Sequence, residues 1–181
     1  MVSAYYFDDN EEGLARETSH PFFVEHATAD FYYSCIDEFS PFGNDSGADT
    51  LSDLQDWYNE RGANDKALTF LKRQIENWGL GSAYLAITEL AQVDAIIAET
   101  DGFCNEIDKA VIATVFGQFK IAGKCDKAML PIAAAAFQRQ RYVAEKARTR
   151  EHHPWEYAAE YLARLDTMES DLDVMKNKKA R

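Results

Sequence analysis

The residues with the clearest chemical potential in this 181-residue chain are acidic, and several lie close together. The segment SPFGNDSGADTL contains Asp45 and Asp49, and Asp37 and Glu38 lie just before it. One or two carboxylates can hold Mg²⁺ together with a substrate phosphate, so a metal-assisted enzyme using the acidic 37–49 loop is one hypothesis. The segment does not match an EF-hand, because its acidic spacing is wrong and the closing Glu is missing.

The same segment also predicts the start of a helix. Asp49 or Thr50 would cap that helix through a side-chain oxygen. Gly43 and Gly47 would supply turns with positive φ, and Asn44 would bond to the local backbone. We favour this interpretation over a metal site, and therefore expect neither a bound metal nor another cofactor.

The other candidate groups form no catalytic pattern in the sequence. The four histidines show neither HExxH nor a zinc-type Cys/His spacing, and three separate cysteines indicate reduced thiols in the cytosol. Ser40 lies near acidic residues, but no histidine is placed to activate it. Walker, Rossmann, nucleophile-elbow and kinase motifs are missing. We predict no catalytic residues and a cytoplasmic location.

The net charge of −12 is concentrated in the first third of the chain. Residues 1–60 contain 14 acidic residues and a single Lys or Arg, Arg16, whereas residues 61–181 are nearly balanced. Such a field repels nucleic acid and anionic membranes, and it attracts basic partners. We therefore predict a basic protein partner and neither nucleic-acid nor membrane binding. The predicted partner-binding residues are Asp37, Glu38, Phe39, Phe42, Asn44, Asp45, Asp49 and Asp53.

Helical periodicity dominates the chain after residue 50. Apolar residues recur at spacings of three and four, and no stretch alternates as a half-buried strand would. Pro154 would occupy a first helical position, and Gly79 and Gly123 would end their helices. The fold is predicted to be all-α, a compact array of about six helices. Their expected ranges are 50–62, 64–79, 82–100, 105–123, 126–148 and 153–175.

A single domain over residues 1–181 is expected. Its first part is an acidic, aromatic-rich N-terminal segment, which comprises an irregular arm at 1–20 and short helical turns with a loop at 21–49. The helical body spans 50–176, and a frayed tail spans 177–181. The acidic N-terminus predicts neither a signal nor a transit peptide. No apolar run approaches the roughly 18 residues of a membrane span.

Residues 18–140 resemble the YfeS-like bacterial proteins, a poorly characterised family. The resemblance rests on SHPFF, FYYSCIDEFSPFGNDSGADTL and IDKAVIATVFGQFKIAGKCDKAMLPIAAAAFQRQ. Its most specific part combines His20-Pro21 with Asp-Glu-Phe-x-Pro-Phe-Gly-x-Asp at 37–45. Some members carry a WGR domain, of which this chain shows no motif. The resemblance implies a bacterial cytosolic helical domain and transfers no catalytic residue.

The leading hypothesis is a non-enzymatic acidic protein-binding domain, specifically a bacterial immunity or antitoxin protein that neutralises a basic toxin. Toxins that act on nucleic acid tend to be basic around their active clefts, and an acidic partner gains fast association by electrostatic steering. Two alternatives stay open, namely the metal-assisted enzyme and a structural or regulatory interaction module. A toxin encoded beside this chain would favour the immunity hypothesis.

Overall fold

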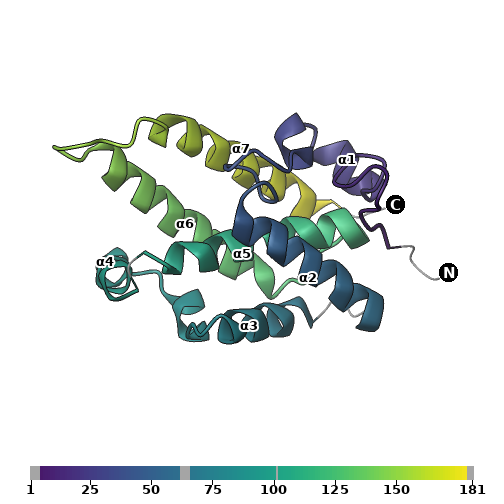
Figure 1. The fold of residues 1–181 in the computed structure, drawn as a ribbon, viewed down its shortest axis with the longest axis horizontal. Helices are drawn as coiled ribbons and strands as arrows, with labels where there is room; N and C mark the ends of the chain where they lie inside the picture. Colours follow the sequence, from purple (N-terminus) through teal and green to yellow (C-terminus); the bar gives the residue numbers. More distant parts are fainter. Residues whose placement is uncertain (1–4, 62–65, 101, 179–181) are drawn as a thin grey trace.

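Helix α5 (Cys104–Ala122) runs through the middle of the fold, where α2, α3 and α6 pack around it (Figure 1). The computed structural model describes residues 5–61, 66–100 and 102–178. These residues form seven α-helices and no strand, which confirms the predicted all-α class. The other elements are α1 (Pro21–His26), η1 (Asp30–Tyr33), α2 (Asp45–Arg61), α3 (Ala67–Asn77), η3 (Ser82–Ala86), α4 (Leu90–Glu99), α6 (Met129–Arg148) and α7 (Ala158–Asn177), where η marks a 3₁₀-helix.

The sequence of α5 explains its central position. Apolar side chains surround the helix instead of forming one stripe, and all of its residues from Ala110 to Ala122 are buried. A helix that is apolar on all sides must be covered on all sides. Gly117 allows α2 to approach closely, because a Cβ at this position would lie 2.8 Å from Leu54 Cδ2.

The structure corrects the predicted helices at 82–100 and 153–175. The range 82–100 contains two elements, η3 and α4, instead of one helix. Pro154 does not begin a helix, since α7 starts at Ala158. The chain first folds back onto the end of α6, where the Trp155 amide donates to the Ala147 carbonyl at 2.9 Å. Helix α7 therefore begins only after this contact, at Ala158.

The predicted helix ends at Gly79 and Gly123 are confirmed. Gly79 has φ 78° and follows α3, and Gly123 has φ 68° and follows α5. The Gly79 and Leu80 amides donate to carbonyls of the last turn of α3, which is the Schellman arrangement. The predicted boundaries at residues 62 and 64 lie outside the described residues, as do 1–4 of the arm and 179–181 of the tail.

Helix α2 begins five residues earlier than predicted. Its N-cap is Asn44, whose Oδ1 accepts a hydrogen bond from the Gly47 amide at 2.9 Å. Asn44 Nδ2 donates to the Ser40 carbonyl at 2.9 Å, which ties the cap to the preceding turn. Asp49 and Thr50 therefore lie in the second turn, and the prediction that one of them is the cap is wrong.

The predicted role of the two loop glycines is also wrong, because neither Gly43 nor Gly47 has a positive φ. Both positions lack space for a side chain. A Cβ at Gly47 would lie 2.1 Å from the Pro41 carbonyl oxygen, and one at Gly43 would lie 2.4 Å from the Asp37 carbonyl oxygen. These glycines let the turn before α2 pack tightly against the start of that helix.

The cap assignment predicts a difference between two substitutions. Asn44→Ala should lower the free energy of unfolding by about 0.5–2 kcal/mol, because it removes the cap. Thr50→Val should leave the free energy unchanged or raise it, since the buried Thr50 hydroxyl has no hydrogen-bond partner among the described residues. Urea titration would measure both values. If Thr50→Val lowered the free energy of unfolding while Asn44→Ala left it unchanged, the assignment of Asn44 as the N-cap would be wrong.

A buried ion pair joins α5 to α6. Asp108 and Arg139 both have fully buried side chains, and Arg139 Nη2 donates to Asp108 Oδ1 at 2.6 Å. Arg139 Nη1 also donates to the Ile87 carbonyl at 2.6 Å, and the Tyr84 hydroxyl donates to Asp108 Oδ2 at 3.1 Å. Burial raises the pKa of Asp108 to about 6, although Arg139 opposes this shift. The pair therefore connects the η3 region to both helices.

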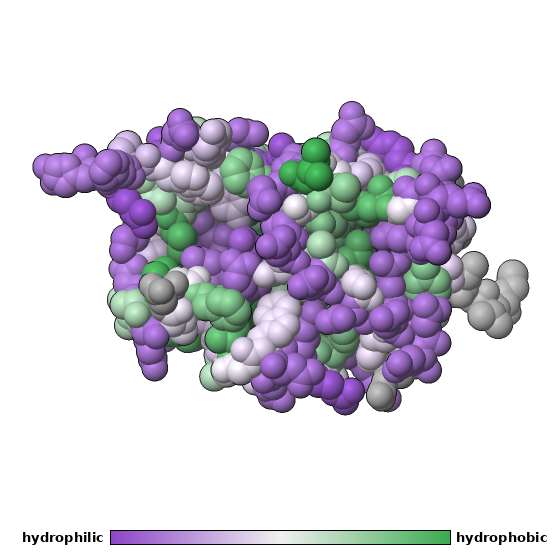
Figure 2. All heavy atoms as spheres, viewed as in Figure 1, coloured by the Kyte–Doolittle hydropathy of each residue, from purple (hydrophilic) through white to green (hydrophobic). Residues whose placement is uncertain are grey.

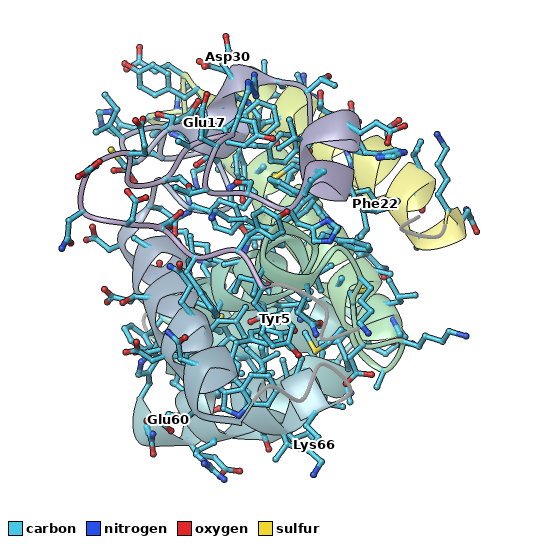
Figure 3. All side chains as sticks on the ribbon, turned by 90° about the vertical axis from the view of Figure 1, so that its right-hand side faces the viewer. Tyr5, Glu17, Phe22, Asp30, Glu60 and Lys66 are labelled. Carbon is cyan, nitrogen blue, oxygen red and sulfur yellow. The ribbon has the colours of Figure 1, made fainter. Side chains whose placement is uncertain are left out.

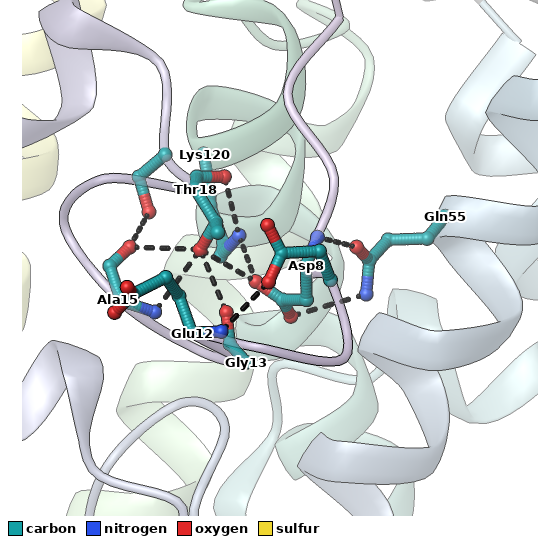
Figure 4. Close-up of polar contacts among 9 residues, drawn as sticks. Asp8, Glu12, Gly13, Ala15, Thr18, Gln55 and Lys120 are labelled. Carbon is teal, nitrogen blue, oxygen red and sulfur yellow. Dashed lines mark hydrogen bonds and ion pairs between the residues drawn. The ribbon is translucent and has the colours of Figure 1, made fainter.

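The N-terminal arm is anchored by a second charged pair, shown in Figure 4. Lys120 of α5 is buried, and its Nζ lies 2.6 Å from Asp8 Oδ1 and 3.1 Å from the Thr18 carbonyl. Asp8 also bonds to Gln55 of α2 through its amide and its carboxylate, at 2.6 and 3.2 Å. Residues 5–20 contain no helix, yet these contacts hold them against α2 and α5.

Hydrophilic side chains cover most of the face shown in Figure 2, with smaller apolar areas between them. Among the described residues, Ile36 is the most exposed large apolar side chain, at 84%. None of the described helices combines the length and the apolar composition needed to cross a bilayer.

Candidate partner-binding surface

The structure distributes the eight predicted partner-binding residues over three places. Asp45, Asp49 and Asp53 are exposed along α2. A second group faces α7, and a third is buried. The second group is Asp37, Glu38 and Phe39, and the third is Phe42 and Asn44.

Phe42 and Asn44 are unavailable to a partner in this structure, and their assignment to the surface needs correction. Phe42 is 1% exposed, and its ring packs against Phe23 with the centroids 6.5 Å apart. Asn44 is 5% exposed and serves as the cap of α2. The tight turn before α2 directs both side chains inward, where they pack beneath the surface.

The second group, residues 37–39, makes contacts with α7 and with the segment that precedes it. Asp37 Oδ2 accepts a hydrogen bond from Arg164 Nη1 at 2.9 Å, so an internal base compensates its charge. The Phe39 ring packs against Trp155 and Tyr161, with centroids 5.8 and 5.2 Å apart. Of these three residues, Glu38 alone is exposed.

Asp45, Asp49 and Asp53 belong to a longer acidic ridge on α2. Asp56 and Glu60 continue the same series, with spacings of four, four, three and four residues. This spacing places all five carboxylates on one side of the helix, and all five residues are exposed. Figure 3 shows Glu60 near the end of α2, at the outer edge of the molecule. We call this set, Asp45, Asp49, Asp53, Asp56 and Glu60, the acidic ridge.

Among the side chains that the structure describes, none forms an ion pair with the five carboxylates of the acidic ridge. Like charges three or four residues apart on a helix repel one another. The repulsion between neighbouring carboxylates lowers the local stability of α2, whereas the position of Asp45 in the first turn favours its negative charge.

The basic residues of α6 do not form ion pairs with the described carboxylates of the ridge. Arg141 bonds to Asp166 and Glu169 of α7, and Lys146 bonds to Asp94 of α4 at 2.7 Å. These cations are compensated within the C-terminal two-thirds of the chain. The charge asymmetry of the sequence therefore persists at the surface.

A cavity of about 290 Å³ lies beside the second half of the acidic ridge. We call it the α2–α3 cavity, because both helices contribute to its walls. Carboxylates and aromatic rings meet there, and its lining residues are Asp53, Asp56, Trp57, Glu60, Phe70, Arg73, Gln74, Asn77 and Trp78. The Trp57 and Phe70 rings pack with centroids 5.6 Å apart.

Sequence reasoning missed most of this cavity. The spacing from Asp53 to Asp56 and Glu60 was a usable signal, because it continues one helical face. Trp57 and Trp78 lie on the apolar stripes of their helices, and half-buried aromatic residues at such positions usually serve the core. Their contribution to a surface cavity depends on how α2 packs beside α3, which periodicity does not reveal.

The described residues contain no group of three His, Cys, Asp or Glu side chains arranged to hold a metal ion. Asp37 pairs with Arg164, while Asp45 and Asp49 project from α2. The metal-assisted hypothesis therefore has no assembled ligand set within the described part of the 37–49 segment.

The described residues form an all-α fold with an acidic ridge on α2 that has no ion pair among the described side chains. Sequence comparison then identifies a relative. The chain is 36% identical over 148 residues to the uncharacterized protein YfeS of Escherichia coli (strain K12), a match that covers 80% of the chain and 59% of that relative. This similarity supports the resemblance to the YfeS-like family of poorly characterised bacterial proteins that its motifs predicted. No family model matches the chain, and no solved structure matches it.

Proposed function

We propose that this protein is a non-enzymatic binding protein of the bacterial cytoplasm, whose acidic ridge binds a basic protein. More specifically, we propose an immunity or antitoxin function, in which the ridge covers a basic cleft of a toxin. The observation that supports this proposal best is the set of five exposed carboxylates on α2 without an ion pair among the described residues. The relative YfeS of Escherichia coli is itself uncharacterized and supports no particular function.

Electrostatics explains how such a ridge would act. Clustered charges of one sign attract an oppositely charged partner before contact and raise the association rate by about 10- to 1,000-fold. A protein that cuts or modifies nucleic acid needs basic side chains to bind phosphates. A rigid row of carboxylates can occupy the same basic surface, because it also presents negative charges at regular intervals. The acidic ridge would then compete directly with nucleic acid.

The neighbouring coding sequence provides the first test. Expression of its product alone should stop cell growth, and co-expression with this chain should restore growth. If the product is harmless, or if this chain does not restore growth, the immunity function is wrong. A harmless product that still binds through the ridge would favour the structural or regulatory alternative.

The second test measures how charge affects association. Reversal of Asp45, Asp49 and Asp53 to Lys should slow association with the basic partner at least tenfold. The effect should shrink in high salt, because the Debye length falls from about 10 Å at 0.1 M to about 3 Å at 1 M. Stopped-flow kinetics at both salt concentrations would measure this change. Asp37 is excluded from the set, since its reversal would also break the pair with Arg164.

Reversal of two ridge residues, Asp45 and Asp49, is matched by reversal of Glu156 and Glu160. Both are exposed acidic residues, and they lie at the start of α7 instead of on the ridge. Their reversal to Lys should change the association rate much less than the ridge variants do. Equal effects from both sets would show that overall charge alone matters, and the proposed binding surface would then be wrong.

A further inference from the structure

We propose that the α2–α3 cavity binds the side chain of an arginine from the basic partner. This inference rests on the proposed function and adds a specific recognition site to the general attraction of the acidic ridge. The volume of about 290 Å³ lies at the small end of the range for ligand pockets, and suits one side chain better than a whole cofactor.

The charges around the cavity favour a cation. Asp53, Asp56 and Glu60 contribute three carboxylates, while Arg73 contributes one positive charge. Arg73 is exposed, and the structure contains no ion pair between it and a described carboxylate. The cavity therefore keeps an excess of negative charge that a partner's cation can balance.

Gln74 provides an independent indication of a ligand. Its side chain lines the cavity, and the residue is 5% exposed. Its Nε2 donates to Asp53 Oδ2 at 3.2 Å, but its Oε1 is buried and accepts no hydrogen bond from the described residues. A buried acceptor without a donor is unfavourable, and a ligand with several N–H groups would satisfy it.

The aromatic residues favour arginine over lysine. Trp57 and Trp78 both line the cavity and are half-buried, so parts of their rings are accessible. A guanidinium group is planar, stacks on indole rings and carries five N–H donors, which suit a cavity that combines carboxylates with aromatic rings. A lysine ammonium is more strongly hydrated and offers donors from a single nitrogen.

The cavity can be tested without knowing the partner. The probe is a capped Gly-Arg-Gly peptide, compared with Gly-Lys-Gly and with Gly-citrulline-Gly, whose side chain is neutral. NMR would follow the indole N–H signals of the three tryptophans. We expect the arginine peptide to shift the Trp57 and Trp78 signals and leave Trp155 unchanged. It should bind at least about fivefold more tightly than the other two peptides.

Near-isosteric variants distinguish the contribution of the cavity to peptide binding from that of the rest of the acidic ridge. Asp56→Asn should weaken binding of the arginine peptide about fivefold or more, and Asp45→Asn should change it little, because Asp45 does not line the cavity. Arg73→Gln should strengthen binding, since it removes a competing cation. Equal weakening by both Asn variants, or equal affinity for all three peptides, would overturn the arginine site.

The two proposals can fail separately. If the ridge reversals slow partner association while the arginine peptide fails to bind, the proposed function stands and the arginine site is wrong. If the peptide binds in the cavity while the ridge reversals leave association unchanged, the site exists but the ridge does not steer a partner.

Discussion

Replacement of Arg139 with methionine should lower the free energy of unfolding by about 3–5 kcal/mol. The substitution removes three kinds of contact at once, namely the ion pair with Asp108, the bond to the Ile87 carbonyl and the stacking over Tyr84 at 4.4 Å. It also leaves the Asp108 carboxylate without its cation in a fully buried position. Urea denaturation at pH 7, followed by circular dichroism, would measure the loss.

The matched control for this prediction is Arg141→Met. Arg141 lies on the same helix and pairs with Asp166 and Glu169, but its side chain is 35% exposed. Exposed pairs contribute about 0–1 kcal/mol, so this variant should cost far less than Arg139→Met. Similar losses for the two variants would show that burial does not determine the contribution of the Asp108 pair.

The cost of Arg139→Met should also depend on pH. Burial raises the pKa of Asp108 to about 6 in the native protein, and loss of the guanidinium should raise it further. An acid with a raised folded-state pKa binds its proton more tightly in the folded protein, so its stability contribution increases as the pH falls. The difference in the free energy of unfolding between the native protein and the variant should therefore be smaller at pH 5 than at pH 7. The same urea titrations at both pH values would measure this change.

Replacement of Lys120 with methionine should release the N-terminal arm and lower the free energy of unfolding by about 2–4 kcal/mol. The Lys120 side chain is fully buried, and burial lowers its pKa, whereas the Asp8 side chain is 19% exposed. Water can therefore compensate part of the charge left on Asp8, which makes this loss smaller than that for Arg139. Trypsin cleavage after Arg16 should accelerate, because the arm would detach more often from α2 and α5.

Lys109→Met provides the comparison for the arm. Lys109 lies on the same helix, but its side chain is 30% exposed and pairs with Glu106 three residues away. A local pair of this kind contributes about 0.2–0.5 kcal/mol, and it does not contact the arm. Unchanged cleavage after Arg16 in Lys120→Met would show that other contacts hold the arm in place.

Local sequence determined the class of the fold. The period of the apolar residues is a property of neighbouring positions, and it indicated helical structure in the regions that form α2 to α7. Gly79 and Gly123 ended their helices as expected, because residues with positive φ favour glycine. The sequence selected Asp45, Asp49 and Asp53 by their charge, whereas their alignment on one helical face follows from the earlier start of α2 in the structure.

Tertiary packing alone decided which of the acidic and aromatic residues remain exposed at the surface, where a partner could contact them. Asp37 meets Arg164 across 127 positions of sequence, and no local pattern distinguishes it from the exposed acids of α2. Asn44, Asp49 and Thr50 are all suitable cap residues, and the bond to Ser40 together with the contact at Gly47 selects the first of them. Phe42 is buried because the turn before α2 packs onto the core. Periodicity records which side of one helix is apolar, whereas burial and charge compensation depend on which distant segments the folded chain brings together.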